Sequence, residues 1–228
     1  MTQIKDVLLD FNTWWASEFN PEFKEREAYG EIKKFIPMPQ IIALTGLRRV
    51  GKTTIMFKIV SDAIREGINP KNIMYFSFDE FKNTEIRQVL EVFQQIVEKD
   101  LGKEKFLILL DEVQKLTDWE NQVKTFYDAF GKSVKIILSG SESLFLHAKS
   151  RETLAGRMFE FVIRPLSFKE FLEFKKMIYS PIGVHEKQLL KAFKDYTLTQ
   201  GFPELFEIRD REVIKKYLIE GIIDKIIY

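Results

Sequence analysis

The stretch that decides the fold is residues 46–53, Gly-Leu-Arg-Arg-Val-Gly-Lys-Thr. It matches G-x-x-x-x-G-K-[ST], a pattern in which a glycine-rich turn leads into a helix and surrounds phosphate groups with backbone amides. The apolar run at 41–44, Ile-Ile-Ala-Leu, precedes it and has the composition of a buried parallel strand. Residues 53–65 follow, with apolar side chains at helical spacing. Strand, turn and helix in this order predict a phosphate-binding loop.

The residue types in this loop explain how it would hold a nucleotide. Gly46 and Gly51 allow the positive φ angles that a tight turn around an anion needs. The loop amides and the helix N-terminus would then face the phosphates. We expect Lys52 to reach the β- and γ-phosphates, the Thr53 hydroxyl to ligate Mg²⁺, and Thr54 to donate to the α-phosphate. The other loop residues expected to line the nucleotide are Leu47, Arg48, Arg49 and Val50.

A second apolar run ends in acidic residues. The segment 106–110 predicts a buried strand, and Asp111 and Glu112 follow it directly. Ligands of open parallel sheets bind beyond the carboxyl ends of the strands, so both carboxylates are expected near the loop. Asp111 would hold Mg²⁺ through water and Glu112 would polarise the attacking water. The alternative for Glu112 is a solvated acid at a strand end.

Composition excludes several classes of protein. The chain has 228 residues, of which 45% are hydrophobic, enough for one core with a small appendage. Its 35 basic and 34 acidic residues give no argument for a nucleic acid or an anionic membrane. The absence of Cys excludes disulfide and thiolate chemistry, and two His cannot make a usual zinc site without carboxylates. No apolar run reaches transmembrane length and no secretory signal opens the chain, so we expect a cytoplasmic protein with no membrane partner.

Hydrophobic periodicity predicts alternating strands and helices up to about residue 165, which indicates a mostly parallel sheet with right-handed crossovers. After that point only helices are predicted. We therefore divide the chain into a core with N-terminal helices, 1–165, and a helical lid subdomain, 166–228. Besides the strands already given, strands are expected at 73–78, 134–138 and 159–163; helices are expected at 4–19, 21–35, 53–65, 85–98, 119–130, 168–176, 187–199 and 211–228, with a loop at 180–183.

Five motifs together resemble the AAA+ ATPases, and specifically their archaeal and bacterial STAND-like branch. This resemblance covers nearly the whole chain. It implies a P-loop NTPase fold with a parallel five-stranded sheet of order 5-1-4-3-2 and a small α-helical lid. It also implies ATP/ADP and Mg²⁺ as ligands, with slow ATP hydrolysis that drives a switch or a motor unit. The motifs are GLRRVGKTT at 46–54, LDEVQ at 110–114, LAGR at 154–157, PLSF at 165–168 and GFP at 201–203.

The resemblance also assigns roles by position. Ser139 and Ser141 match the region where a polar side chain senses the γ-phosphate, although the usual AAA+ asparagine is missing. Arg157 matches an arginine finger or nucleotide sensor. Pro203 belongs to a lid element near the adenine, and Arg26 lies where relatives make adenine-side contacts. The alternatives are a plain strand-end turn for the two serines, a surface salt bridge for Arg157 and a helix–helix turn around Pro203.

Relatives of this kind usually continue into a further C-terminal domain, so we expect the lid of this chain to be truncated. Residues 213–227 carry an apolar stripe that would either dock on the lid or pair two copies. A homo-oligomer could therefore form through this helix or through Arg157, and an unidentified protein or DNA could be the effector. A nucleotide-gated binding module with negligible hydrolysis is the main alternative to an ATPase. A small-molecule kinase is a third, but the sequence shows neither an arginine-rich lid nor an acceptor pocket.

Overall fold

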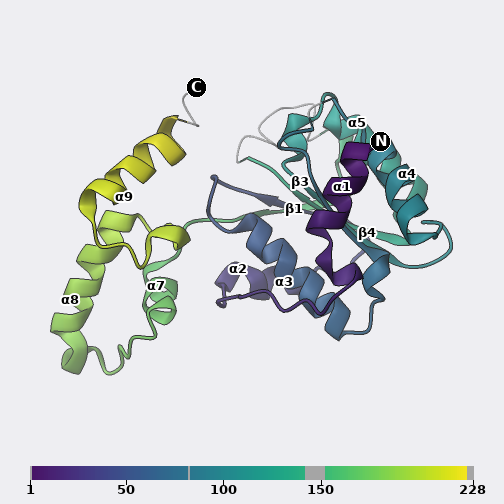
Figure 1. Cartoon of the computed structure of the whole chain (residues 1–228). Helices are drawn as coiled ribbons and strands as arrows, with labels where there is room; N and C mark the ends of the chain where they lie inside the picture. Colours follow the sequence, from purple (N-terminus) through teal and green to yellow (C-terminus); the bar gives the residue numbers. More distant parts are fainter. Residues whose placement is uncertain (1, 82, 142–151, 225–228) are drawn as a thin grey trace.

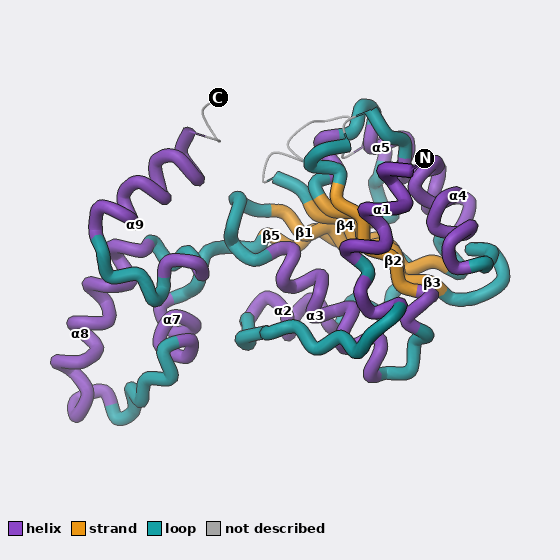
Figure 2. The backbone as a smooth tube through the Cα atoms, in the orientation of Figure 1, coloured by secondary structure: helices purple, strands orange, loops and turns teal. Residues whose placement is uncertain are grey.

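A five-stranded parallel sheet forms the centre of the molecule (Figures 1 and 2). The computed structural model describes residues 2–81, 83–141 and 152–224. The strand order is β2-β3-β4-β1-β5, which confirms the expected order 5-1-4-3-2 and the P-loop NTPase fold. The strands are β1 Ile41–Thr45, β2 Ile73–Ser77, β3 Phe106–Asp111, β4 Val134–Ser139 and β5 Met158–Val162.

Helices cover both faces of this sheet, as the continuous apolar runs of the strands predict. Along β3 the side chains alternate, with Phe106, Ile108 and Leu110 in one core and Leu107 and Leu109 in the other. The first core also contains side chains of α1, α4 and α5, and the second contains those of α2 and α3. These helices are α1 Thr2–Phe11, α2 Glu27–Lys33, α3 Lys52–Arg65, α4 Ile86–Val97 and α5 Trp119–Phe130.

The first helix is shorter than predicted, because the Asn12 side chain hydrogen-bonds to the backbone of Tyr75 on β2. It ends at Phe11, and a 3₁₀ turn, Thr13–Trp15, follows instead of a helix to residue 19. The buried Asn12 amide accepts from the Tyr75 N–H at 2.7 Å and donates to the Tyr75 carbonyl at 2.9 Å. Trp14 and Trp15 both donate to the carbonyl of Ile73. The segment thus satisfies the free edge of β2, where an uncovered strand would invite pairing with another chain.

The second predicted helix, 21–35, is also shortened. It begins only at Glu27, because Arg26 keeps an extended backbone (φ −123°, ψ 133°). Two further 3₁₀ turns, Pro70–Asn72 and Val113–Lys115, lie beside strands β2 and β3.

The part of the chain after β5 is helical, as expected, and lies to one side of the sheet (Figure 2). The loop expected at 180–183 instead covers 175–181, because α7 ends at Phe174 and α8 already begins at Ile182. No helix among residues 2–81, 83–141 and 152–224 is long and apolar enough to cross a membrane. The elements are α7 Phe168–Phe174, α8 Ile182–Thr199, the 3₁₀ turn η5 Pro203–Leu205, α9 Arg211–Leu218 and the π-helical turn η6 Ile219–Ile223.

The C-terminal apolar stripe docks in part on the rest of the chain. Ile214 and Ile222 are buried in the same core as α3, whereas Val213 and Ile223 remain 49% and 45% exposed. The stripe therefore has a docked side and a solvent side, with Tyr217 and Leu218 partly buried, and its last two members, Ile226 and Ile227, lie outside the described residues. Pairing of two copies through the exposed side stays a prediction.

Candidate nucleotide-binding site

The predicted phosphate-binding loop connects β1 to α3 and has the backbone that its glycines suggested. Gly46 has φ 141° and Gly51 has φ 97°, both in the region that favours glycine. A Cβ atom at Gly46 would lie 2.2 Å from the carbonyl oxygen of Ile163, so no other residue fits there. Arg49 also has a positive φ, 63°, which a non-glycine residue rarely adopts. The loop therefore curls tightly at the carboxyl end of the central strand.

Lys52 is the first residue of α3, and its side chain folds over the loop. Its Nζ donates to the carbonyl oxygens of Gly46 at 3.0 Å and Leu47 at 2.9 Å. Burial lowers the pKa of Lys52 below its ordinary value, and the nearby Glu112 and Asp111 carboxylates oppose that shift. The ammonium group is thus held in the hollow where phosphates would enter.

Asp111 is the polar centre of the site. Its buried carboxylate accepts hydrogen bonds from the Thr53 hydroxyl at 2.8 Å and the Tyr75 hydroxyl at 2.7 Å. The Ser139 hydroxyl and the Glu112 N–H donate to its other oxygen. Burial, together with the Asp111 charge, raises the pKa of Tyr75, so this phenol remains a donor. Side chains from β2, β3, β4 and α3 therefore meet on one carboxylate.

Glu112 lies one residue further and has a left-handed backbone conformation (φ 56°, ψ 40°). Its carboxylate accepts a hydrogen bond of 2.5 Å from the Gln114 amide nitrogen. The amide oxygen of Gln114 is buried and has no hydrogen-bond partner among the residues that the structure describes. Gln114 therefore restrains the carboxylate that was expected to act on water.

A cavity of about 340 Å³ opens between the loop, the strand ends and the lid turn η5. Of the residues predicted from the sequence, this cavity gathers most of the loop, both acidic residues and Pro203. Its lining consists of Arg48, Arg49, Gly51, Lys52, Thr53, Thr54, Ser77, Asp79, Asp111, Glu112, Pro203 and Glu204. Ser139 does not line the cavity, but its hydroxyl donates a hydrogen bond to Asp111, which does. Ser141 follows β4 at the same edge of the sheet, next to the undescribed residues 142–151.

Arg26 is close to the loop, but its guanidinium is fully engaged there. It donates to the Val50 carbonyl at 2.9 Å, the Arg164 carbonyl at 2.7 Å and the Glu170 carboxylate at 2.9 Å. Each of the three nitrogens makes one of these contacts, so Arg26 has a structural role here, and its predicted adenine-side contact stays a prediction. The physical reason is that a buried charge must be paired and hydrogen-bonded.

Arg157 is not brought to this cavity. Its backbone carbonyl accepts from Ile41 N–H at the amino end of β1, whereas the loop follows the carboxyl end. Its side chain pairs with Asp128 at 3.0 Å. The length of β1 separates this arginine from the cavity of its own chain in this structure, and its role as a finger or sensor stays a prediction. Action on a neighbouring copy stays a prediction.

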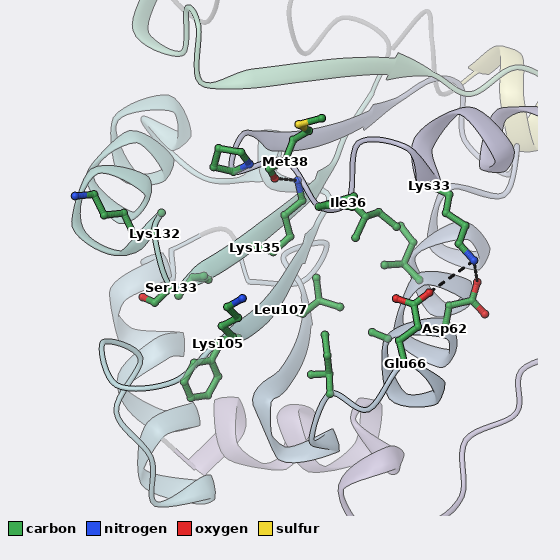
Figure 3. A pocket seen from close by; sticks show the side chains of 18 of the residues that line it. Lys33, Ile36, Met38, Asp62, Glu66, Lys105, Leu107, Lys132, Ser133 and Lys135 are labelled. Carbon is green, nitrogen blue, oxygen red and sulfur yellow. Dashed lines mark hydrogen bonds and ion pairs between the residues drawn. The ribbon is translucent and has the colours of Figure 1, made fainter.

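A second cavity, of about 470 Å³, lies at the amino ends of the strands (Figure 3). Lys135 donates to the Met38 carbonyl there at 2.7 Å, and Lys33 faces Asp62 and Glu66 across the opening. Burial lowers the pKa of Lys135 to about 8. Ligands of open parallel sheets bind at the opposite edge. The cavity around Lys52 is therefore the candidate nucleotide site.

Comparison with known proteins agrees with this geometry. A protein-family model described as an AAA domain matches residues 38–172. The chain belongs to this family. It is 33% identical over 232 residues to uncharacterized protein MJ1637 of Methanocaldococcus jannaschii, covering 97% of this chain and 47% of the relative. An uncharacterized protein of Haemophilus influenzae is 29% identical over 189 residues, which cover 82% of this chain and 45% of the relative. The chain thus spans about half the length of the curated relatives it matches.

Two solved structures share the fold of this chain. The Hsp104–ADP complex of S. cerevisiae has a TM-score of 0.51 at 14% identity, over 75% of this chain and 26% of the other. The S. cerevisiae Hsp104:casein complex in its extended conformation has a TM-score of 0.51 at 12% identity, and the match covers 89% of this chain and 37% of the other. Family and fold together support nucleotide binding of the AAA type.

The donor set fits a nucleotide with a hard divalent cation. Mg²⁺ prefers oxygen ligands and keeps several waters, so one hydroxyl and one carboxylate are enough protein ligands. Thr53 and Asp111 supply this pair. Sequence reasoning missed Tyr75 and Glu204, because only the strand order and the lid position bring them to the site, and it gave Gln114 of the LDEVQ motif no role.

Proposed function

We propose that this AAA-family chain binds ATP and ADP with Mg²⁺ at residues 46–54 and hydrolyses ATP slowly, as a nucleotide-driven switch or motor unit. The observation that carries the proposal is the meeting of Lys52, Thr53 and Asp111 at the carboxyl edge of the sheet. We also place the chain in the STAND-like branch and its core–lid boundary near residue 165, on the motifs LAGR, PLSF and GFP.

Each side chain has a defined task in this proposal. Lys52 exchanges its two backbone carbonyl acceptors for phosphate oxygens, since both are acceptors within its reach. Thr53 and Asp111 would hold Mg²⁺, which supplies charge neutralisation of the phosphates when bound. Glu112 orients water and accepts its proton, because Asp111 is already committed to hydroxyl donors. Ser139 keeps Asp111 in position from the neighbouring strand.

A nucleotide-gated binding module with negligible hydrolysis is the second candidate. It is favoured by the 2.5 Å contact between Gln114 and Glu112, which restrains the proposed base. The position of Arg157 away from its own site points the same way, because arginine fingers accelerate phosphoryl transfer. In that case bound ATP, without hydrolysis, would control whether the chain binds its partner, a protein or DNA.

Calorimetry with ATP and Mg²⁺, followed by measurement of released phosphate, tests both candidates. We expect saturable binding and slow multiple turnover in the wild type, and no binding in Lys52→Ala. Lys71→Ala is the matched control, since this exposed lysine precedes β2 at the opposite edge of the sheet. Unchanged affinity in Lys52→Ala would refute the site. Binding without turnover would favour the gated module.

A further inference from the structure

Arg49 reaches from the phosphate-binding loop to the lid. Its guanidinium lies 3.5 Å from the carboxylate of Glu204, which follows Pro203 in the lid turn η5. The same guanidinium stacks over the ring of Tyr217 of α9 at 4.6 Å from the ring centre. A Cβ atom added to Gly221 would lie 3.5 Å from it, so the turn after α9 also passes close by. One loop side chain therefore contacts two segments of the lid, η5 and α9, and lies near a third.

The two lid residues are joined to each other. The Tyr217 hydroxyl donates to the Glu204 carboxylate at 2.6 Å. Burial and this hydrogen bond raise the pKa of Tyr217 to about 12, so the phenol stays a donor at neutral pH. Glu204 thus receives a proton donor from α9 and a cation from the loop. We call Arg49, Glu204 and Tyr217 the lid cluster.

The lid cluster borders the phosphate cavity itself. Arg49 and Glu204 both line it, next to Lys52 and Thr53. The neighbouring arginine behaves differently, because Arg48 faces Asp79 of the core at 3.8 Å. Of these two loop arginines, only Arg49 is paired with the lid.

Bound phosphates would compete for Arg49. Its side chain and that of Glu204 are 44% and 55% exposed, so the pair is weak and exchangeable. A polyphosphate in the cavity attracts the arginine and repels the Glu204 carboxylate. ATP carries more negative charge than ADP and should do both more strongly.

We propose that the lid cluster is a nucleotide-responsive latch, in which Arg49 holds the lid through Glu204 and Tyr217 until a triphosphate displaces Glu204. The latch rests on the proposed function for its response to nucleotide, but not for its closed state. Glu204 and Tyr217 are positioning residues, because they act through Arg49. Bound ATP would release the lid to move relative to the sheet.

Spin-label distances test the closed state without nucleotide. The chain has no Cys, so Lys34→Cys on the core and Val184→Cys on the lid give the only two labelling sites. We expect a narrow distance distribution that broadens in Glu204→Arg and narrows again in Arg49→Glu/Glu204→Arg. Lys216→Ala, an exposed neighbour on α9, should leave it unchanged. Unchanged distances in Glu204→Arg would overturn the latch.

Calorimetry with ATP and with ADP tests the response. Glu204→Gln should tighten ATP binding by about fivefold, the lower range of measured coupling between sites, and ADP binding by less. In the labelled chain, ATP should broaden the distance distribution and ADP should change it less. An equal gain in affinity for both nucleotides in Glu204→Gln, or no gain in affinity for ATP, would overturn the proposed response of the latch to nucleotide. A wild-type chain that binds neither nucleotide would refute the proposed function, whereas the nucleotide-free distances judge the latch separately.

Discussion

Arg26 and Glu170 form a buried ion pair between the segment before β1 and the lid helix α7, with 2.9 Å between Nε and Oε1. Both side chains are only 6% exposed. The same guanidinium also donates to the loop carbonyl of Val50 and to Arg164 in the link after β5. Glu170 further accepts from the backbone N–H of Ser167. The pair therefore fixes one end of the lid to the phosphate-binding loop.

Arg26→Ala should destabilise the protein strongly. Breaking a buried pair leaves the other charge uncompensated and costs about 3–5 kcal/mol. Urea unfolding measures this loss. Lys169→Ala is the matched control, because its pair with Glu27 joins the same two segments on the surface and should change stability little. Equal losses in both variants would show that Arg26 is not a clamp.

The Glu170 carboxylate should make stability sensitive to acid. Burial alone would raise its pKa, but the backbone donors of Ser167 and Glu27 and the Arg26 charge outweigh burial and hold the pKa below its ordinary 4.5. A depressed folded-state pKa contributes stability above pH 4.5 and loses it as the pH falls through the folded value. Glu170→Gln should therefore lose stability at neutral pH and show a weaker decline below pH 4.5. Urea unfolding over a pH series measures both effects, and parallel declines would contradict the assignment.

Asn12→Ala should weaken the cover of the sheet edge. The change leaves the N–H and carbonyl of Tyr75 without their partner, and each unsatisfied buried group costs about 1–3 kcal/mol. Thermal unfolding should show a lower midpoint than for Asn69→Ala, whose side chain caps only an exposed turn. Light scattering should show more association in Asn12→Ala, since β2 is then an open edge. A midpoint no lower than that of Asn69→Ala would contradict this account.

The central sheet could be predicted from the sequence because its strands are continuous apolar runs, and the loop because its glycines and Lys52 carry the chemistry locally. The N-terminal helix was predicted too long, because its apolar spacing continues to Phe19 while Asn12 pairs with a residue far along the chain. The structural role of Arg26 could not be predicted for the same reason, as its partner Glu170 is a long-range contact. Periodicity reports which face is apolar, but it does not report which distant backbone group a polar side chain satisfies.

Glu112→Gln should separate binding from hydrolysis. The amide keeps the shape of the side chain and can still contact Gln114, but it cannot accept a proton from water. Calorimetry should show unchanged ATP affinity, and released phosphate should fall by about 10²–10⁴-fold, the usual contribution of a general base. Glu98→Gln is the matched control, because Glu98 also has a left-handed backbone (φ 55°) but lies at the end of α4. Turnover at the parental rate in Glu112→Gln would assign the role elsewhere.

The last prediction is that Arg157 acts on the site of a neighbouring copy of the chain. β1 has five residues and separates Arg157 at its amino end from the loop at its carboxyl end. At about 3.3 Å per residue, the strand spans about 16 Å, further than an arginine side chain reaches. Its side chain is 33% exposed and pairs with Asp128, so it is accessible from outside. A role in hydrolysis therefore requires a neighbouring copy.

Mixing two inactive variants tests that role, because each lacks a different part of a shared site. Lys52→Ala cannot bind nucleotide but keeps Arg157, and Arg157→Ala keeps its own loop but offers no finger. If Arg157 acts on a neighbour, a mixed assembly contains intact sites, and released phosphate should recover from the low level of either variant. An arginine finger contributes on the order of 10³–10⁵ in rate, so even partial recovery is measurable. Lys132→Ala in place of Arg157→Ala is the control, since this exposed lysine also lies at the amino edge of the sheet and should keep its own activity. Full activity of Arg157→Ala by itself would remove this arginine from the mechanism.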